Sequence, residues 1–326
     1  MDTDADMGSM PLVSVIIPAY NNEKHIGEAI DSVLRQDYSP LEIIVVDDGS
    51  TDRTPMIVSD YGNRVVLLQQ ENQGSAVARN LGIKAARGRY IAFLDADDVW
   101  WKHKIRYQVA ELRHNGHSMA YSRFIWWEPD ANGQYSIADN EFELESNPRL
   151  SSGLISTGWI YTDLLLDCIV WTSTVIVEKT ALEAVGLFDP SLRKGQDYDL
   201  WLKLARSIEM LGLEQPTALY RRHSGSITDS VKEINYEHLI LSRAIERWGI
   251  TSPDGRRAPE SLLSAKLYRS CFNHGYSHLR HGNAQIAMES LSASMRYSGI
   301  RFKTLFYIAL ANLRRSVRIL HVMRIR

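Results

Sequence analysis

Three carboxylates stand within four positions at Asp95, Asp97 and Asp98, directly after the apolar run from Tyr90 to Leu94. Carboxylates this close together repel one another unless a cation lies between them. Mg²⁺ and Mn²⁺ prefer oxygen ligands and commonly bridge carboxylates to the phosphates of a bound ligand. The spacing therefore predicts a divalent-metal site that holds a diphosphate. The alternative is a polar junction that caps the next helix.

Composition narrows the class of protein. The chain has 326 residues, 44% of them hydrophobic, and a net charge of -2, which gives no general attraction to nucleic acid. Cys168 and Cys271 are too few for a disulfide framework and lack metal-ligand spacing, which favours a reducing, cytoplasmic compartment. Residues 1–10 lack the basic and apolar segments of a signal peptide, and we expect them to be disordered.

Strand-like and helix-like segments alternate from Leu12 to Trp100. Strands are expected at 12–17, 41–46, 64–68 and 89–94, and helices near 23–35, 51–61 and 75–86. This alternation is typical of an α/β fold with a mainly parallel sheet flanked by helices, in which ligands bind beyond the carboxyl ends of the strands. The residues that follow the four strands are 18–21, 47–50, 71–74 and 95–98.

The first two of these turns indicate the kind of ligand. The turn after the first strand, Pro18-Ala-Tyr20-Asn21, lacks the glycine pattern of a dinucleotide site and the Gly-Lys-Ser/Thr of a P-loop, which excludes both classes. Asp48 follows the second strand, where its carboxylate could accept the ring N–H of uracil or thymine. In the structural alternative, Gly49 adopts a special backbone angle and Ser50 caps the next helix.

Four ordered motifs resemble those of the family 2 glycosyltransferases, which have the GT-A fold. They are Val13-Ser-Val-Ile-Ile-Pro-Ala-Tyr-Asn21, Glu42-Ile-Ile-Val-Val-Asp-Asp-Gly-Ser-Thr-Asp52, Asn72-Gln-Gly-Ser-Ala-Val-Ala-Arg-Asn80 and Tyr90-Ile-Ala-Phe-Leu-Asp-Ala-Asp-Asp98. The resemblance extends from Pro11 to about Thr228. It implies a nucleoside or donor site and a metal site, Mn²⁺ or Mg²⁺ being held by the Asp-x-Asp pair Asp95 and Asp97; the donor residues would be Pro18, Tyr20, Asp48, Arg79, Asp95 and Ala96. For Arg79 the alternative is an ion pair on a helix surface.

Two later segments complete the site that the resemblance implies. Gly195-Gln-Asp-Tyr-Asp199 resembles the catalytic-base segment, in which Asp197 would be the base; Gln196 stands where the family usually has Glu. The alternative is a carboxylate that caps the helix starting near Asp199. In Tyr220-Arg-Arg-His223, Arg222 would contact the donor diphosphate and His223 would contribute a nitrogen ligand to the metal.

The resemblance implies a metal-dependent inverting glycosyltransferase. It would move a hexose from a nucleotide-diphosphate sugar, above all a UDP-sugar, to a hydroxyl group of a glycan or lipid-linked acceptor in cell-surface polysaccharide synthesis. The alternative is a non-catalytic scaffold that binds a nucleotide sugar. Acceptor contacts are expected between 101 and 230, where tryptophans offer surfaces for sugar rings or else fill the core; they are Trp126, Trp127, Trp159 and Trp171. Thr172 and Ser173 either reach the acceptor or end a turn.

The predicted organisation is a transferase domain at 11–230, with its nucleotide-binding half at 11–100, followed by a helical region at 231–326. One hairpin in this region is similar to a tetratricopeptide unit, which predicts packing on the catalytic domain or self-association into a homo-oligomer. No Asp or Glu follows Glu289, whereas eight Arg or Lys residues do. Together with apolar residues three or four apart, this predicts either an amphipathic helix docked on its own protein or contact with the inner face of the cell membrane; the apolar residues are Leu305, Ile308, Ala309, Leu313, Val317 and Leu320.

Overall fold

The computed structural model describes residues 10–130, 132–136, 149–151, 154–222, 232–299 and 301–323, without the side chains of 316–323. The chain divides into two compact units. One comprises residues up to 164 together with 168–223, and the other comprises 165–167 together with 224–326.

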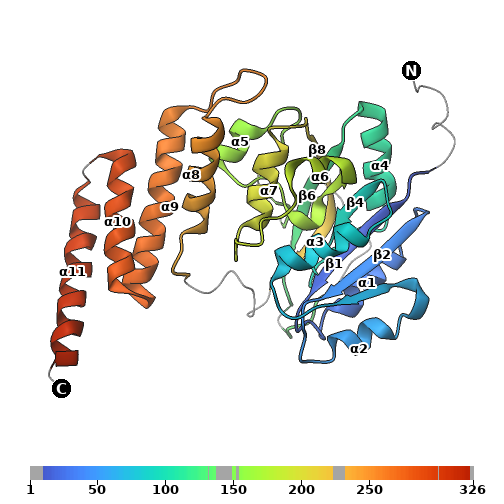
Figure 1. Ribbon diagram of the computed structural model, residues 1–326, viewed down its shortest axis with the longest axis horizontal. Coiled ribbons are helices and arrows are strands. Elements are labelled where there is room, and N and C mark those ends of the chain that lie inside the picture. The colour runs from blue at the N-terminus through green and yellow to red at the C-terminus, as the bar shows by residue number, and fades with distance from the viewer. Residues whose placement is uncertain are drawn as a thin grey trace. The chain divides into compact units, whose positions relative to one another are not determined.

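The first unit contains an eight-stranded sheet with the strand order β3-β2-β1-β4-β7-β6-β8-β5 (Figure 1). Its strands are β1 Val13–Ala19, β2 Leu41–Asp47, β3 Val66–Gln69, β4 Tyr90–Phe93, β5 Val99–Trp100, β6 Met119–Trp127, β7 Ile176–Glu178 and β8 Leu211–Arg221. The strands β1 to β4 are parallel and lie where the sequence predicts them. The other half is mixed, because β7 runs antiparallel to both β4 and β6, and β5 antiparallel to β8.

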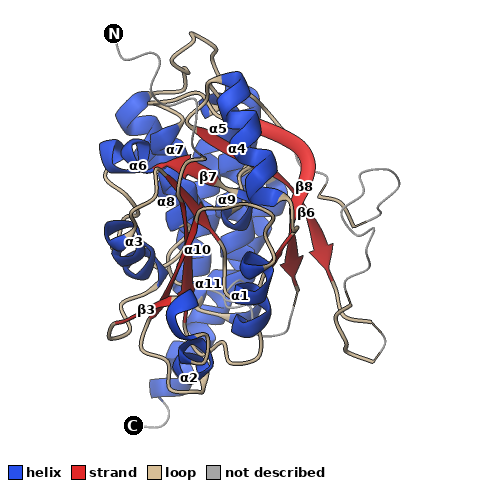
Figure 2. Cartoon of the chain, turned by 90° about the vertical axis from the view of Figure 1, so that its right-hand side faces the viewer, coloured by secondary structure: helices blue, strands red, loops and turns tan. Residues whose placement is uncertain are grey.

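Helices cover both faces of this sheet (Figure 2). They are α1 Ile26–Leu34, α2 Thr54–Ser59, α3 Ser75–Ala85, α4 Lys104–Asn115, α5 Tyr161–Leu166, α6 Lys179–Val185 and α7 Gln196–Leu204, with short 3₁₀ turns η1 Gly62–Arg64 and η2 Thr172–Thr174. In β1, Val15 and Ile17 join a core cluster with residues of α1 and α4, whereas Ile16 faces α3. Gly82 makes the α3 contact possible, since a Cβ there would lie 2.6 Å from Ile16 Cγ2. Two covered faces explain why β1 is apolar at successive positions rather than alternating.

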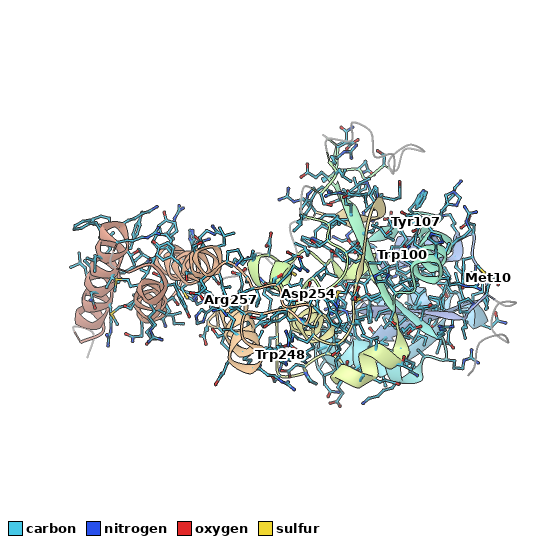
Figure 3. All side chains as sticks on the ribbon, turned by 90° about the horizontal axis from the view of Figure 1, so that it is seen from above. Met10, Trp100, Tyr107, Trp248, Asp254 and Arg257 are labelled. Atoms are coloured by element: carbon cyan, nitrogen blue, oxygen red, sulfur yellow. The ribbon has the colours of Figure 1, made fainter. Side chains whose placement is uncertain are left out.

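The second unit is helical. It contains α8 Tyr236–Trp248, α9 Glu260–His281, α10 Ala284–Ser298 and α11 Phe302–Met323, and the last three run side by side (Figure 1). The connection between α8 and α9 carries Asp254 and Arg257, which are labelled in Figure 3 together with Trp248 at the end of α8. Gly275 lets α9 and α10 approach closely, because a Cβ there would lie 2.9 Å from the Ala287 carbonyl oxygen. Within the described residues, no helix combines the length and apolar character that crossing a membrane requires.

Candidate functional site

The acidic turn after β4 is held by an ion pair. Arg79, on α3, donates to Asp95 Oδ1 at 2.6 Å, and its guanidinium lies 5.4 Å from the ring centre of Phe188. The Arg79 side chain is nearly buried, and its Nε has no hydrogen-bond partner among the described residues. Of the two alternatives left open for Arg79, an ion pair is present, but it lies inside the protein and its partner is the first carboxylate of the Asp-x-Asp pair.

This turn concentrates negative charge. Burial raises the pKa of Asp95, the carboxylates of Asp97 and Asp197 raise it further, and Arg79 opposes them. The pKa of Asp98 lies well above its ordinary value because of burial and, secondly, because of Asp97 and Asp95. Asp95, Asp97 and Asp197 therefore lie close enough to influence one another, although no group of three metal-ligand side chains is assembled among the described residues. The predicted ligand His223 lies outside those residues.

Asp98 is a structural residue. It is buried, with Oδ2 accepting from the Ser173 hydroxyl at 2.5 Å and Oδ1 accepting from the backbone N–H of Arg221 at 3.1 Å. Both of its oxygens are thus used to join the acidic turn to η2 and to the end of β8. Asp98 therefore fixes the position of the turn, whereas Asp95 and Asp97 remain the carboxylates considered for the metal site.

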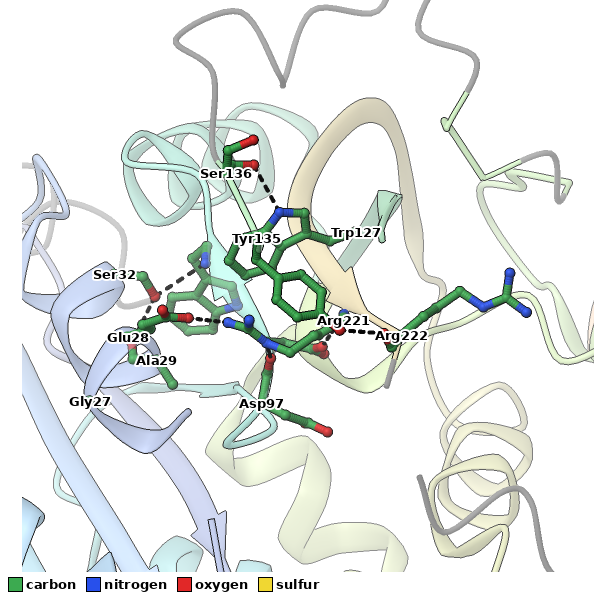
Figure 4. Close-up of polar contacts among 12 residues, drawn as sticks. Gly27, Glu28, Ala29, Ser32, Asp97, Trp127, Tyr135, Ser136, Arg221 and Arg222 are labelled. Carbon is green, nitrogen blue, oxygen red and sulfur yellow. Dashed lines mark hydrogen bonds and ion pairs between the residues drawn. The ribbon is translucent and has the colours of Figure 1, made fainter. Parts of the chain in front are cut away.

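The buried arginine at the end of β8 is Arg221, the neighbour of the residue that the sequence singled out. Its Nε donates to the Asp97 carbonyl at 2.7 Å, its guanidinium pairs with Glu28, and the guanidinium packs against two rings, 4.0 Å from the ring centre of Trp127 and 4.5 Å from that of Tyr135 (Figure 4).

Arg222 points the other way in the same view (Figure 4). Its exposed side chain pairs with Glu128 at 2.8 Å and lies 5.2 Å from the ring centre of Trp126. Adjacent strand residues point to opposite faces, so only one of the two arginines can reach the acidic turn from inside. The adjacent arginines in the sequence did not indicate which of the two would reach it.

The predicted base belongs to the same site. Asp197 is half-buried in the first turn of α7, where its Oδ2 accepts from the Thr172 hydroxyl at 3.1 Å and its Oδ1 from its neighbour's backbone N–H at 2.9 Å. The next residue of η2, Ser173, accepts from the Asp95 N–H at 3.1 Å. Thus η2 joins the predicted base to the Asp-x-Asp turn, a link that the sequence left open.

Gln196, which replaces the family's usual Glu, has a structural task. Its Oε1 accepts from the Ser75 hydroxyl at 2.9 Å, while its Nε2 donates to the Leu192 carbonyl at 2.7 Å. A carboxylate could accept the first of these bonds but could not donate the second. The amide therefore suits a position that fastens the start of α7 to the start of α3.

A buried lysine supports η2 from the side of α4. Lys104 Nζ donates to the Thr174 carbonyl at 2.9 Å and to Gln108 Oε1 at 2.5 Å, and it lies 4.8 Å from the ring centre of Trp100. Burial lowers its pKa well below the ordinary value for lysine. Trp100 itself donates from Nε1 to the Ser173 carbonyl at 2.7 Å. Nothing in the sequence distinguished Lys104 from a surface lysine of a helix.

Asp48 is tied into the loop that precedes α3. Its carboxylate accepts from Gln70 Nε2 at 2.6 Å and from the backbone N–H groups of Gln73 at 2.9 Å and Gly74 at 2.8 Å. Gly49 has φ +77°, as predicted, and a Cβ there would lie 2.8 Å from the Asn72 nitrogen. A shallow groove opens beside this turn; it is lined by Asp47, Gly49, Ser50, Gln69, Gln70, Glu71 and Asn72.

The prediction that Ser50 caps the next helix is wrong. Helix α2 begins only at Thr54, whose backbone N–H is accepted by Asp52 Oδ1 at 2.9 Å. The Ser50 hydroxyl instead accepts from the Asn21 N–H at 2.9 Å, because the turn after β1 folds against the turn after β2. Serine at this position therefore joins two turns of the sheet edge.

Other predicted site residues surround these turns. Pro18 pairs with Val46 in the parallel ladder of β1 and β2, and the Tyr20 side chain is half exposed just beyond β1. Ala96 is buried in the main core cluster. Of the four tryptophans, Trp127 is fully buried, whereas Trp126 and Trp171 are half-buried and their ring centres lie 5.8 Å apart.

Comparison with known proteins gives the same identification. The family model described as glycosyl transferase family 2 matches residues 14–160. A UDP-Glc:alpha-D-GlcNAc-diphosphoundecaprenol beta-1,3-glucosyltransferase of Escherichia coli, WfgD, is 32% identical over 72% of this chain and 87% of its own length. An uncharacterized glycosyltransferase of Rickettsia prowazekii is 36% identical over 60% of this chain, and the match spans 59% of that relative.

Solved structures share the fold. Residues 1–349 of Staphylococcus aureus TarS, in complex with UDP-GlcNAc, superpose with a TM-score of 0.64 at 18% identity, covering 87% of this chain and 81% of that one. The mannosyltransferase PcManGT of Pyrobaculum calidifontis, in complex with GDP-Man and Mn²⁺, gives 0.58 at 19% identity, covering 98% and 83%. With the acidic turn after β4 and Asp197 gathered around η2, these matches lead to one conclusion: the chain belongs to glycosyl transferase family 2 and has the GT-A fold.

Proposed function

We propose that the protein transfers a sugar from a UDP-sugar to a hydroxyl group of a lipid-linked glycan, with inversion at the anomeric carbon, in the synthesis of a cell-surface polysaccharide. The observation that carries the proposal is the linkage through η2, where Thr172 contacts Asp197 and Ser173 contacts the backbone of Asp95. A base and an acidic turn held in one frame are what a single in-line displacement between acceptor and donor requires.

A divalent cation suits the acidic turn. The donor set is made of carboxylate oxygens, which are hard ligands, and the pKa of Asp95 is raised by burial and, beyond that, by the nearby carboxylates of Asp97 and Asp197, which Arg79 opposes. We propose that Asp95 and Asp97 hold Mn²⁺ or Mg²⁺, with His223 as a further ligand. Such an ion, when bound, would stabilise the negative charge of the departing nucleoside diphosphate.

The residues of the chain would divide the remaining work. Asp197 takes the proton of the acceptor hydroxyl as that oxygen attacks the anomeric carbon, while the bond to the diphosphate breaks. Thr172 keeps the Asp197 carboxylate oriented through its hydrogen bond, and Arg221 orients Asp97 by holding its carbonyl. Because attack and departure occur on opposite faces of the sugar, the configuration inverts and no covalent intermediate forms.

The donor would lie beyond β1, β2 and β4. We propose that Pro18, Tyr20 and the groove beside Asp47 hold the nucleoside, and that Arg222 meets the diphosphate. For Asp48 to accept a uracil N–H, the Gln70 amide would have to give up its bond to that carboxylate. A UDP-sugar is favoured because the relative WfgD is named for UDP-Glc and the TarS structure contains UDP-GlcNAc, whereas PcManGT was solved with GDP-Man.

A lipid-linked acceptor is supported by the relatives. WfgD is named for a diphosphoundecaprenol-linked acceptor, and TuaG of Bacillus subtilis, 31% identical over 89% of its own length, is named a putative teichuronic acid biosynthesis glycosyltransferase. Trp171, which precedes Thr172, and Trp126, whose ring centre lies 5.8 Å from that of Trp171, are both half-buried and would offer rings to the acceptor sugar.

The test is release of free nucleotide from UDP-, GDP- and dTDP-sugars with Mn²⁺ and mixed glycan acceptors. We compare the wild type with Asp97→Ala and Asp197→Asn, and use Asp199→Asn as the matched control because Asp199 pairs with Lys203 on the same helix. Turnover of one donor that fails in both site variants and survives in the control is the expected result. Donor binding by calorimetry without any turnover would instead favour the nucleotide-sugar-binding scaffold.

A further inference from the structure

Helix α11 packs on its own unit through Thr304, Ala311 and Tyr307, whose ring centre lies 5.8 Å from that of Phe272 and 5.1 Å from that of Tyr276 on α9. Thr304 and Ala311 are fully buried, and the Thr304 hydroxyl lies 3.0 Å from the Tyr268 hydroxyl of α9. Ile308, which the sequence placed on the apolar face with Leu305 and Leu313, is half-buried and lies on this inner side. The phenylalanines of the helix and its leucines up to Leu313 are left out of this contact.

Those large side chains face outward. Phe302 is 90% exposed, Phe306 61% and Leu313 64%, and Leu305 and Leu310 are also exposed. At about 100° per residue, these five positions fall within an arc of about 140° on one side of the helix. Isolated exposed apolar residues are ordinary, but a continuous stripe with two phenylalanines indicates a surface that is covered by something else.

Charge distinguishes the occupant. Lys303, Arg314 and Arg315 are exposed on the same helix, Arg301 is exposed directly before it, and the chain carries no Asp or Glu after Glu289. Three of them are held on α9: Arg301 lies 4.3 Å from the ring centre of Tyr268, Lys303 lies 5.3 Å from that of Phe272, and Arg314 donates to the Leu279 carbonyl. These contacts hold the three cations beside the apolar stripe without neutralising their charge.

We propose that the outer face of α11 binds the surface of an anionic lipid bilayer. The phenyl and leucyl side chains would enter the boundary between headgroups and acyl chains, and the flanking cations would meet lipid phosphates. A second copy of this chain fits less well, because two such faces would bring like charges together at every edge. The proposal goes beyond the transfer reaction and does not depend on it.

Flotation of the full chain with vesicles tests this binding. We use vesicles of phosphatidylcholine alone and of phosphatidylcholine with phosphatidylglycerol, and compare the wild type with the double variant Phe302→Ser, Phe306→Ser. Leu262→Ser is the matched control, since Leu262 is 54% exposed on α9. The expected result is flotation on the anionic vesicles only, with the partition coefficient about 100-fold lower in the double variant and unchanged in the control.

Two results would overturn the proposal. One is equal flotation of wild type and double variant, with both folded by circular dichroism. The other is a wild-type dimer in solution, measured by light scattering, that the double variant abolishes while the wild type fails to float; this would assign the face to a second copy. Because both phenylalanines are exposed, the substitutions leave the core intact, and loss of flotation cannot be ascribed to unfolding.

Discussion

The hydroxyl of Thr172 lies 3.1 Å from Asp197 Oδ2 and donates to it, so the proposed base is held by a turn outside its own helix. The following residue, Ser173, is bonded to the backbone N–H of Asp95 and to the carboxylate of Asp98. Two segments, the start of α7 and the acidic turn, are thereby fixed to one 3₁₀ turn, from which they are about 25 and about 75 residues away in sequence, and displacement of this turn would misalign both halves of the site.

Loss of the Thr172 hydroxyl should slow catalysis without weakening donor binding. A hydrogen bond to a charged group contributes about 1.5–3 kcal/mol, so we expect Thr172→Val to lower kcat roughly tenfold or more. Thr172→Ser keeps the hydroxyl and should retain most of the activity. Steady-state kinetics measures both variants, with the donor sugar that the nucleotide-release test selects. Equal activity of the valine and serine variants would show that the bond to Asp197 is not used.

The two adjacent arginines should differ sharply. Arg221→Met removes a buried guanidinium that holds the Asp97 carbonyl and packs against two aromatic rings, and should lower the free energy of unfolding by about 2–4 kcal/mol. Arg222→Met removes an exposed ion pair and should change it by less than about 1 kcal/mol. Urea unfolding measures both variants.

Kinetics separates positioning from stability at Arg221. If Arg221 orients Asp97, the Mn²⁺ concentration for half-maximal rate should rise in Arg221→Met under conditions in which the variant remains folded. Arg221→Lys should recover part of this loss. An unchanged metal requirement in the folded variant would restrict Arg221 to a structural role.

Neutralising Asp97 should stabilise the metal-free protein. Asp97 raises the pKa of both Asp95 and Asp98. Their folded-state pKa values lie above the ordinary value of 3.8. Between that value and the raised ones, the folded state binds more protons than the unfolded chain, and the free energy of unfolding therefore falls as pH rises through this range. Asp97→Asn reduces this loss, so we expect the Tm without metal to exceed that of the wild type by about 1–4 °C at pH 7.5.

Acid and metal should each remove that difference in a distinct way. Near pH 4 the carboxylates protonate and the Tm gap should close. With Mn²⁺ the wild type should be stabilised by metal binding to its folded state, whereas Asp97→Asn should not. Differential scanning fluorimetry measures the Tm of both proteins at pH 7.5 without metal, near pH 4, and with Mn²⁺. A wild type that is insensitive to Mn²⁺ at pH 7.5 would contradict a metal site at this turn.

Lys104 should make the free energy of unfolding rise with pH. Its folded-state pKa is well below 10.5, so the unfolded chain binds more protons in the window between the two values and stability rises with pH through it. Between pH 7 and 9 we expect the free energy of unfolding of the wild type to rise relative to that of Lys104→Met, by at most about 1.4 kcal/mol per pH unit. Lys102→Met, at an exposed neighbour, is the control. Parallel pH profiles for all three would contradict the inference.

Sequence patterns were sufficient for the first half of the fold and for the identity of the acidic segments. β1 to β4 and α1 to α3 lie where periodicity predicts them, because each strand is apolar on both faces and each turn after a strand is polar. Motifs at Asp48, Asp95, Asp97 and Asp197 likewise depend on residues that are contiguous in the chain. Local order of this kind is encoded locally, so one sequence is enough to read it.

Only the tertiary structure decided which partners these residues have. Arg221 rather than Arg222 reaches the acidic turn because strand pleating directs neighbours to opposite faces, and the pairing of β8 sets which one faces inward. Lys104 supports η2, and Ser50 joins two turns, through contacts between segments far apart in sequence. Likewise, α11 buries Thr304 and Ala311 and exposes Phe302 and Phe306. The sequence pattern therefore shows that a helix has an apolar face, but the packing of the helix decides whether that face is buried.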